Sequence, residues 1–397
     1  MDLLSARLRA LSPSETFAMA QKSNELKAQG IDVISLSVGE PDFNTPDHIK
    51  EAAKKAVDDN YSFYSPVAGF LDLRKAICEK LKRENDLDYT PAQIVVSNGA
   101  KQSICNVVLS IVESGDEVII PAPFWVSYPE MVKLADGKPV FVYAGIDQNF
   151  KITPEQLEGA ITPKTKALIL CSPSNPTGSV YTKEELEGLA NVLAKHPKVH
   201  VISDEIYEHI NYVGKHESIS QFATIRDRVV VVNGVSKGYA MTGWRIGWIA
   251  APQWIASACS MLQGQYTSGA SSISQRAALA AYTGRQDCVG EMREAFERRR
   301  DLVVKLLSDI PGLTVNKPMG AFYVFPEFKS YIGRSFNGNE MKTATDIAMF
   351  LLEEAHVACV GGDAFGAPGC IRLSYATSDD KITEAVRRIS LALEKLV

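Results

Sequence analysis

Short, almost entirely apolar segments alternate with longer amphipathic ones along most of the chain, and this pattern limits the possible folds more than any other feature. The runs 167–170 (ALIL) and 229–232 (VVVV) contain no polar residue. Strands of this kind are typical of a sheet covered on both faces, and strands separated by helical patterns indicate parallel βαβ units. The sequence therefore predicts an α/β fold with a mostly parallel sheet.

The expected elements follow from hydrophobic periodicity and from turn residues. Helices are predicted over 14–29, 99–112, 183–195, 291–307 and 379–396. Strands are predicted over 93–97, 117–121, 139–143, 166–171, 199–203, 228–233 and 245–250.

Two domains are expected because 397 residues exceed the usual single-domain size. The texture changes near residue 290, where a long charged helix and short strands replace the alternating pattern. The first forty residues carry too little structure for a core of their own. We expect residues 1–45 to form an N-terminal arm and part of the small domain, residues 46–290 the large domain, and residues 291–397 the rest of a small α+β domain.

Composition excludes several classes of protein. The net charge of −5 comes from interleaved charges, which argues against a nucleic-acid-binding surface. Residues 1–10 do not have the pattern expected of a secretory signal, and we expect no membrane-spanning segment because no apolar run is long enough. Seven isolated cysteines predict a reducing, cytoplasmic location, and six histidines without a ligand-type spacing argue against a metal site.

The segment 234–247 (GVSKGYAMTGWRIG) follows a strand of the buried type and contains Lys237. A lysine in such a loop becomes a nucleophile near neutral pH when neighbouring cations lower its pKa. Most lysines in glycine-rich loops are simply solvated, so the segment alone does not identify a site.

Other polar residues follow predicted strands, and each allows a structural interpretation beside a functional one. Asn175 lies in SPSNPTG, which forms turns without any ligand. Asp204 ends a strand, where open α/β sheets place ligands, although it could also cap a helix. Arg372 lies within an apolar strand and needs an anion, which an internal ion pair could supply.

Three further segments have weaker signals. The turn at Gly99, Ala100 and Lys101 joins a strand to a helix, and backbone amides at such a turn can bind phosphate. Trp125 is either an aromatic contact for a ligand or a core residue. Tyr64 is either a functional residue or an exposed aromatic side chain in a loop.

Segment 234–247 resembles the lysine signature of the class I aminotransferases, a family of fold-type-I pyridoxal-phosphate enzymes. Further family motifs occur in the same order between Ser12 and Tyr375, among them NPTG at 175–178 and R-x-S at 372–374. The resemblance implies the fold of type I PLP-dependent transferases, with a large domain built on a seven-stranded, mostly parallel sheet. It also implies an enzyme that transfers amino groups.

The resemblance also assigns roles. Lys237 would bind pyridoxal 5′-phosphate as a Schiff base, with Asp204 at the ring nitrogen, Asn175 and Tyr207 at the phenolic oxygen, and Trp125 stacked on the ring. The residues implied at the cofactor phosphate are Gly99, Ala100, Lys101, Ser236, Arg245 and, from the neighbouring subunit of a homodimer, Tyr64. The residues implied at the substrate are Gly39, Lys101, Trp125, Asn175 and Arg372, the last as the clamp on the α-carboxylate.

Leu11-Ser12-Pro13-Ser14 and Lys101 resemble the bacterial aspartate aminotransferase subgroup, in which a lysine meets the distal carboxylate of the substrate. Segment 263–273 contains no arginine that could replace it. We therefore predict amino transfer from L-aspartate to 2-oxoglutarate. A prephenate or aromatic aminotransferase, a β-lyase of the same fold and a non-catalytic regulator remain alternatives.

Overall fold

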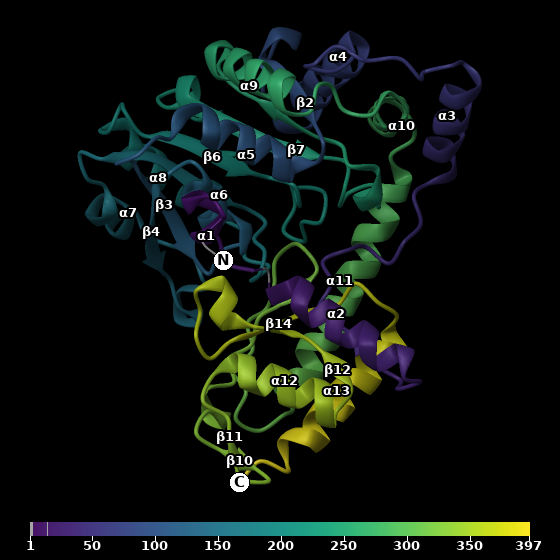
Figure 1. The fold of residues 1–397 in the computed structure, drawn as a ribbon, viewed down its shortest axis with the longest axis vertical. Helices are drawn as coiled ribbons and strands as arrows, with labels where there is room; N and C mark the ends of the chain where they lie inside the picture. The colour runs from purple at the N-terminus through teal and green to yellow at the C-terminus, as the bar shows by residue number, and fades with distance from the viewer. Residues whose placement is uncertain (1–2, 14) are drawn as a thin grey trace.

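The structure is a computed structural model that describes residues 3–13 and 15–397. Figure 1 shows a larger part built around a sheet and a smaller part that holds the C-terminus, with helix α11 (Asp287–Ser308) running between them. Helix α2 (Glu15–Ala28) packs with the smaller part, although it lies near the start of the chain. Residue 14, which is included in the predicted helix 14–29 and in the Leu11–Ser14 motif, lies outside the described residues.

The central sheet has seven strands in the order β2-β8-β7-β6-β5-β3-β4. Its strands are β2 (Ile94–Ser97), β3 (Glu117–Ala122), β4 (Lys138–Tyr143), β5 (Thr165–Cys171), β6 (His200–Asp204), β7 (Val229–Gly234) and β8 (Gly247–Ala250). Only β8 runs against its neighbours, β2 and β7; the other pairs are parallel. The predicted seven-stranded, mostly parallel sheet is confirmed.

Helices cover both faces of this sheet, which explains the apolar strands. In β5, Leu168 and Leu170 face one hydrophobic cluster, whereas Ala167 and Ile169 face the other, because successive side chains of a strand point to opposite faces. One face is covered by α3 (Asp47–Asp58), α4 (Leu71–Lys80), α7 (Pro154–Ala160), α8 (Lys183–Ala194) and α10 (Ser272–Thr283). The other is covered by α5 (Ala100–Ile111), α6 (Ser127–Leu134) and α9 (Gln253–Tyr266).

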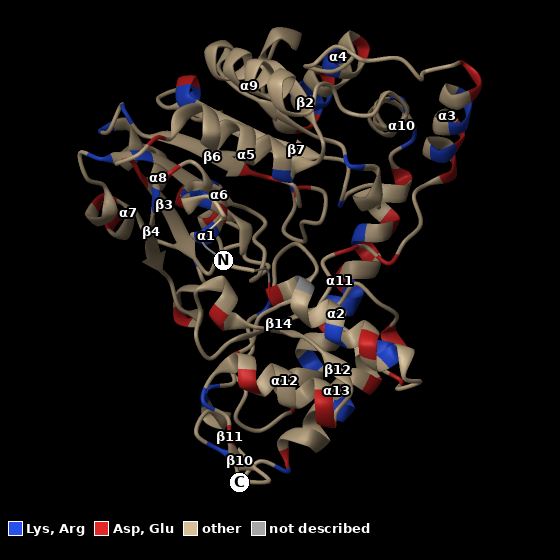
Figure 2. Cartoon of the chain, in the orientation of Figure 1, with Lys and Arg blue, Asp and Glu red and all other residues tan. Residues whose placement is uncertain are grey.

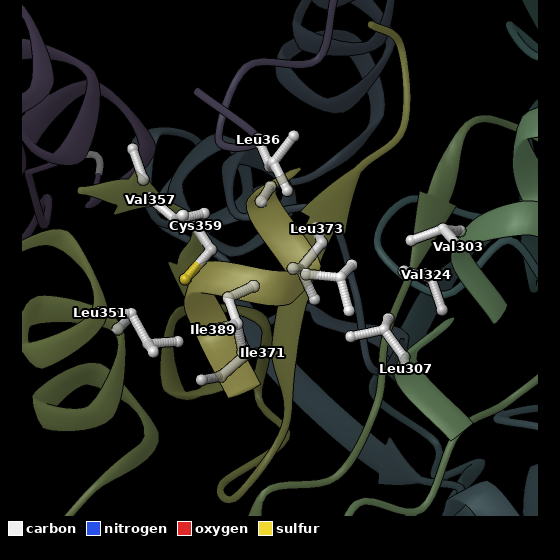
Figure 3. Packing of buried hydrophobic residues seen from close by; sticks show 14 of the residues in the cluster. Leu36, Val303, Leu307, Val324, Leu351, Val357, Cys359, Ile371, Leu373 and Ile389 are labelled. Carbon is white, nitrogen blue, oxygen red and sulfur yellow. The ribbon is translucent and has the colours of Figure 1, made fainter. Parts of the chain in front are cut away.

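The smaller part has a core of its own, one hydrophobic cluster that includes Leu36, Leu351, Leu373 and Ile389 (Figure 3). The N-terminal segment joins it directly, because β1 (Ile34–Ser35) pairs in parallel with β12 (Val357–Ala358). Its other strands are β9 (Tyr323–Val324), β10 (Ser335–Phe336), β11 (Asn339–Glu340), β13 (Val360–Gly361) and β14 (Ile371–Ser374). Its other helices are α12 (Ala344–Glu354) and α13 (Asp379–Leu393), while the short α1 (Ala6–Arg9) contacts α6.

Most differences from the predicted elements are confined to element ends. The strand expected over 245–250 begins only at Gly247, because a turn at 242–244 leads into Arg245, whose φ of +55° is left-handed. The helix expected over 291–307 begins earlier, at Asp287.

Acidic and basic residues are interspersed over the part of the chain that the structure describes. In Figure 2 both acidic and basic residues occur along α2, α11 and α13. Among the described helices, none combines the length and the apolar character needed to cross a bilayer. All seven cysteines are free thiols.

Candidate active site

The predicted site residues converge at one edge of the central sheet. Strands β2, β3, β5, β6 and β7 run in the same direction, so their carboxyl ends share this edge, where α/β sheets bind ligands. Because β8 is antiparallel, its first residue, Gly247, lies opposite Ser97 and Gly234 at the same edge. Arg245, which precedes β8, is thereby brought beside the ends of the other strands.

A cavity of about 640 Å³ lies at this edge, where the larger part meets the smaller one. Eleven of the thirteen predicted site residues line it: Gly39, Ala100, Lys101, Trp125, Asn175, Asp204, Tyr207, Ser236, Lys237, Arg245 and Arg372. Gly99 does not line the cavity itself but lies against the guanidinium of Arg245, which does. Tyr64 does not line the cavity; its side chain is 98% exposed.

Lys237 has the electrostatic environment of a reactive amine. Burial in the cavity lowers the pKa of its ammonium to about 8; the positive charges of Arg245 and Arg372 act in the same direction, and Glu40 opposes them. Its Nζ donates to the carbonyl oxygen of Gly39 at 2.6 Å. An appreciable fraction of the amine is therefore neutral, and nucleophilic, near neutral pH.

Asp204 is a buried carboxylate that receives two hydrogen bonds. Tyr128 donates its hydroxyl to Oδ2 at 2.6 Å, and the backbone N–H of Ile206 donates to Oδ1 at 3.2 Å. Burial raises the pKa of Asp204 to about 6, although both hydrogen bonds oppose that rise. A cationic partner in the cavity would bring the pKa down and complete the site.

Arg372 is a buried cation without an acidic partner in residues 3–13 and 15–397. It is 2% exposed, and its guanidinium donates to Asn175 Oδ1 at 2.9 Å and to the Ser37 carbonyl at 2.6 Å. No carboxylate of the described residues forms a salt bridge with it, and its Nε has no partner among them. The alternative of an internal ion pair is therefore wrong for these residues, and the guanidinium is available to an anion that enters the cavity.

Tyr323 lies between several of these residues, and the sequence interpretation did not include it. Its hydroxyl is 2.7 Å from that of Tyr207, its ring lies 4.7 Å from the Arg372 guanidinium, and it packs against the backbone of Gly39. Its place on β9 joins the smaller part of the molecule to Tyr207, which follows β6. No local signal in the sequence distinguishes Tyr323 from a core tyrosine.

The part of the cavity beside Arg245 suits a phosphate. Arg245 lies over the first turn of α5 and donates to the carbonyls of Asn98 and Thr242 at 3.3 and 2.8 Å. A side chain at Gly99 would overlap this guanidinium, and one at Gly247 would overlap the backbone of Ala100. Because these two positions are glycines, the Arg245 guanidinium can lie next to the first turn of α5. The backbone N–H groups of that turn have no partner within the helix, so they and the guanidinium can donate to the same anion.

Lys101 and Trp125 form a further part of the wall. Lys101 Nζ lies 4.9 Å from the centre of the Trp125 ring, and burial, followed by the charge of Arg245, lowers the pKa of its ammonium. The Trp125 ring in turn makes an edge contact with Tyr128, at 5.3 Å between ring centres. Tyr128, Thr16 and Glu40 also line the cavity, and the sequence interpretation gave them no role.

Comparisons with known proteins identify the family of this chain. Residues 31–389 match the family model for "Aminotransferase class I and II". The chain is 49% identical to an aspartate/prephenate aminotransferase of Cereibacter sphaeroides, over 98% of both chains. It is also 49% identical to an aspartate aminotransferase of Geobacillus stearothermophilus, over 98% of this chain and 99% of the relative. The crystal structure of an aspartate aminotransferase from Rhizobium meliloti superposes with a TM-score of 0.96 at 42% identity, over 99% of both chains.

Proposed function

From the premise that this chain belongs to the class I and II aminotransferases, we propose that it transfers the amino group of L-aspartate to 2-oxoglutarate, giving oxaloacetate and L-glutamate. One observation carries the proposal. A lysine with a pKa of about 8 shares a cavity with a buried carboxylate, Asp204, and with a buried arginine, Arg372, that has no acidic partner in the part of the chain that the structure describes.

The cofactor is pyridoxal 5′-phosphate, which, when bound, withdraws electrons from the Cα of the amino acid. The residues fit this group. The Arg245 guanidinium and the amides of Ala100 and Lys101 offer donors for its phosphate, together with Ser236. Trp125 offers an aromatic face for its ring.

Within this site each side chain has a distinct task. Asp204 would hold a proton on the ring nitrogen, and the Lys237 amine would hold the cofactor through its aldehyde and, once displaced by the substrate, would carry the proton that leaves Cα. Because Asn175 Oδ1 accepts from Arg372, its NH₂ group is left to donate to the phenolic oxygen, beside the Tyr207 hydroxyl. Arg372 binds the α-carboxylate of the substrate, and the backbone at Gly39 lies beside it.

Lys101 is the residue proposed to bind the distal carboxylate of aspartate. It lies in the wall of the cavity and makes no salt bridge with the described residues, and segment 263–273 offers no arginine in its place. Transamination of prephenate is the second candidate, because a relative at 49% identity is an aspartate/prephenate aminotransferase. The same ammonium would bind a carboxylate of that substrate.

We also propose that the enzyme is a cytoplasmic homodimer and that residues 46–290 form its large domain, with 1–45 and 291–397 forming the small one. Exposed aromatic side chains support the dimer: Phe63, Tyr64 and Tyr266 are 81%, 98% and 72% exposed. Tyr64 would then reach the cofactor phosphate of the neighbouring subunit. Free thiols agree with a reducing compartment.

Borohydride reduction tests the identity of the reactive amine. The protein, incubated with pyridoxal phosphate and reduced, should carry one cofactor per chain on Lys237. Lys237→Ala should lose both label and turnover, whereas Lys101→Ala, the matched control within the same cavity, should keep the label. Stable labelling of Lys237→Ala would contradict the assignment.

A substrate panel tests the specificity. Lys101→Ala should raise the KM for aspartate by about 10- to 100-fold, the loss of one contact between charged groups, and change the KM for phenylalanine little. Comparable kcat/KM values for prephenate and aspartate would favour the second candidate. An equal rise in KM for aspartate and phenylalanine would remove Lys101 from distal-carboxylate binding.

A further inference from the structure

The hydroxyl of Tyr128 makes the shortest contact to Asp204 in the cavity. Tyr128 is the second residue of α6 and is less than 2% exposed. Its hydroxyl lies 2.6 Å from Asp204 Oδ2, a distance typical of a hydrogen bond to a charged oxygen. No other side chain of the described residues donates to this carboxylate.

The direction of this hydrogen bond follows from the acidity of the two groups. Burial, together with the negative charge of Asp204, raises the pKa of Tyr128 well above its usual value, so the phenol keeps its proton. The same bond opposes the effect of burial on Asp204. Tyr128 is therefore the donor, and the carboxylate form of Asp204 is the form that it stabilises.

The charged groups around Asp204 do not stabilise its carboxylate form in place of the Tyr128 hydroxyl. Glu205, the next residue, raises the pKa of Asp204, while the ammonium of Lys237 lowers it less than the two hydrogen bonds do. Cys171, opposite Asp204 on β5, is a neutral thiol whose pKa burial raises to about 12. Within the described part of the chain, the backbone N–H of Ile206 is the one other donor to the carboxylate.

Tyr128 also fixes the relative position of two parts of the site. Its ring meets the edge of Trp125, with 85° between the ring planes, and its backbone N–H donates to the Trp125 carbonyl at 3.0 Å. A single rigid side chain thus links the residue proposed to stack on the cofactor ring with the residue proposed to bind the ring nitrogen.

We propose that Tyr128 is a positioning residue whose hydroxyl keeps Asp204 ionised and directed at the ring nitrogen of pyridoxal phosphate. The inference rests on the proposed function. Each oxygen of an ionised carboxylate has two lone pairs, so the bonds from Tyr128 and Ile206 leave acceptor sites free for a ring N–H. Without the phenol, the buried carboxyl would take up a proton at a higher pH and lose its charge-assisted bond to the ring.

The test uses pyridoxal phosphate labelled with ¹⁵N in the ring, whose chemical shift reports the protonation of the ring nitrogen. In the wild-type holoenzyme the nitrogen should stay protonated into the alkaline range. In Tyr128→Phe its pKa should fall by about 1 to 2 pH units, the loss of one hydrogen bond to a charged group. The dissociation constant for the cofactor should rise about tenfold or more.

Tyr181→Phe is the matched control. Tyr181 is also buried, and its hydroxyl accepts from the backbone N–H of Ile152 at 2.9 Å, but it does not line the cavity. The control loses the same atom from a buried tyrosine and should leave the ¹⁵N titration unchanged. A wild-type titration in Tyr128→Phe, or an equal change in both variants, would overturn the inference.

A second measurement does not depend on the cofactor. Incorporation of 3-fluorotyrosine at position 128 keeps the shape and makes the phenol a stronger donor, so the pKa of the Asp204 carboxyl should shift downward in ¹³C NMR of the cofactor-free protein. An unchanged Asp204 pKa would overturn the inference even if Tyr128→Phe failed to fold. A wild-type protein that binds no pyridoxal phosphate would refute the proposed function instead, whatever the carboxyl titration showed.

Discussion

Replacement of Gly99 by alanine should weaken cofactor binding through Arg245. Gly99 has a φ of +83°, and a Cβ there would lie 2.8 Å from Arg245 Cζ and closer still to one of its terminal nitrogens. The guanidinium is the end of a flexible side chain, so the chain can fold if Arg245 turns away from the first turn of α5. That movement removes the donor proposed to bind the phosphate.

Gly115 offers a control that separates this effect from backbone strain. Its φ is +96°, and no atom lies within 4 Å of the Cβ position. Alanine at either position adopts an unfavourable conformation that costs about 1–3 kcal/mol. The free energy of unfolding should therefore fall by a similar amount in both variants. Gly99→Ala should lose somewhat more, because Arg245 is also displaced.

The expected change in affinity follows from the hydrogen bonds to a charged phosphate, about 1.5–3 kcal/mol. At about 1.4 kcal/mol per factor of ten, the dissociation constant for pyridoxal phosphate should rise about 10- to 150-fold in Gly99→Ala. It should stay unchanged in Gly115→Ala. Absorbance titration of the cofactor-free proteins measures the affinity, and urea unfolding measures the stability. Equal dissociation constants in the two variants would refute the proposed contact.

Three other outcomes are expected. Lys80→Met should reduce the free energy of unfolding by about 3–5 kcal/mol because the buried Glu208 carboxylate keeps Asn85 and His209 but loses its ammonium partner, and the double variant Lys80→Met with Glu208→Leu should recover most of that loss in urea unfolding; no recovery would argue against the ion pair. The rate at which the cofactor-free enzyme reacts with pyridoxal phosphate should rise with pH to a midpoint near 8, since the lowered pKa of Lys237 makes its neutral amine predominant above that pH; a midpoint near 10.5, the usual lysine value, would contradict this environment. Arg372→Lys keeps the charge but loses the paired donors to Asn175 and Ser37, so the KM for aspartate and for phenylalanine should rise together, unlike the selective rise expected for Lys101→Ala.

The sheet was predictable because local composition reflects burial. Val229 to Val232 have no polar side because alternate residues enter two separate cores, and only a sheet covered on both faces allows this. The direction of β8 was not predictable in the same way. Four residues cannot show whether a strand runs with or against its neighbours, since pairing is decided by hydrogen bonds to segments distant in the sequence.

For the site, too, the residues marked by local sequence were predictable and those placed by distant contacts were not. Motifs around Lys237, Asn175 and Arg372 were identifiable because each residue lies in a short segment that resembles its family, and the match to the aminotransferase model confirms the class of enzyme and its cofactor. Tyr323 and Tyr128 were not identified. They meet Tyr207 and Asp204 across 116 and 76 residues of chain, and in their own segments they look like ordinary core tyrosines.

The sequence alone determined the class of fold and the order of the strands along the chain, because these depend on neighbouring residues, and through the family resemblance it predicted Lys237 as the reactive lysine. The tertiary structure alone decided which charged side chains lack an oppositely charged partner and which titratable groups have a raised or lowered pKa. Arg372 could have faced a carboxylate, and Lys237 could have faced water. Burial and charge depend on groups that arrive from other strands, and only the folded chain brings those groups within hydrogen-bonding distance.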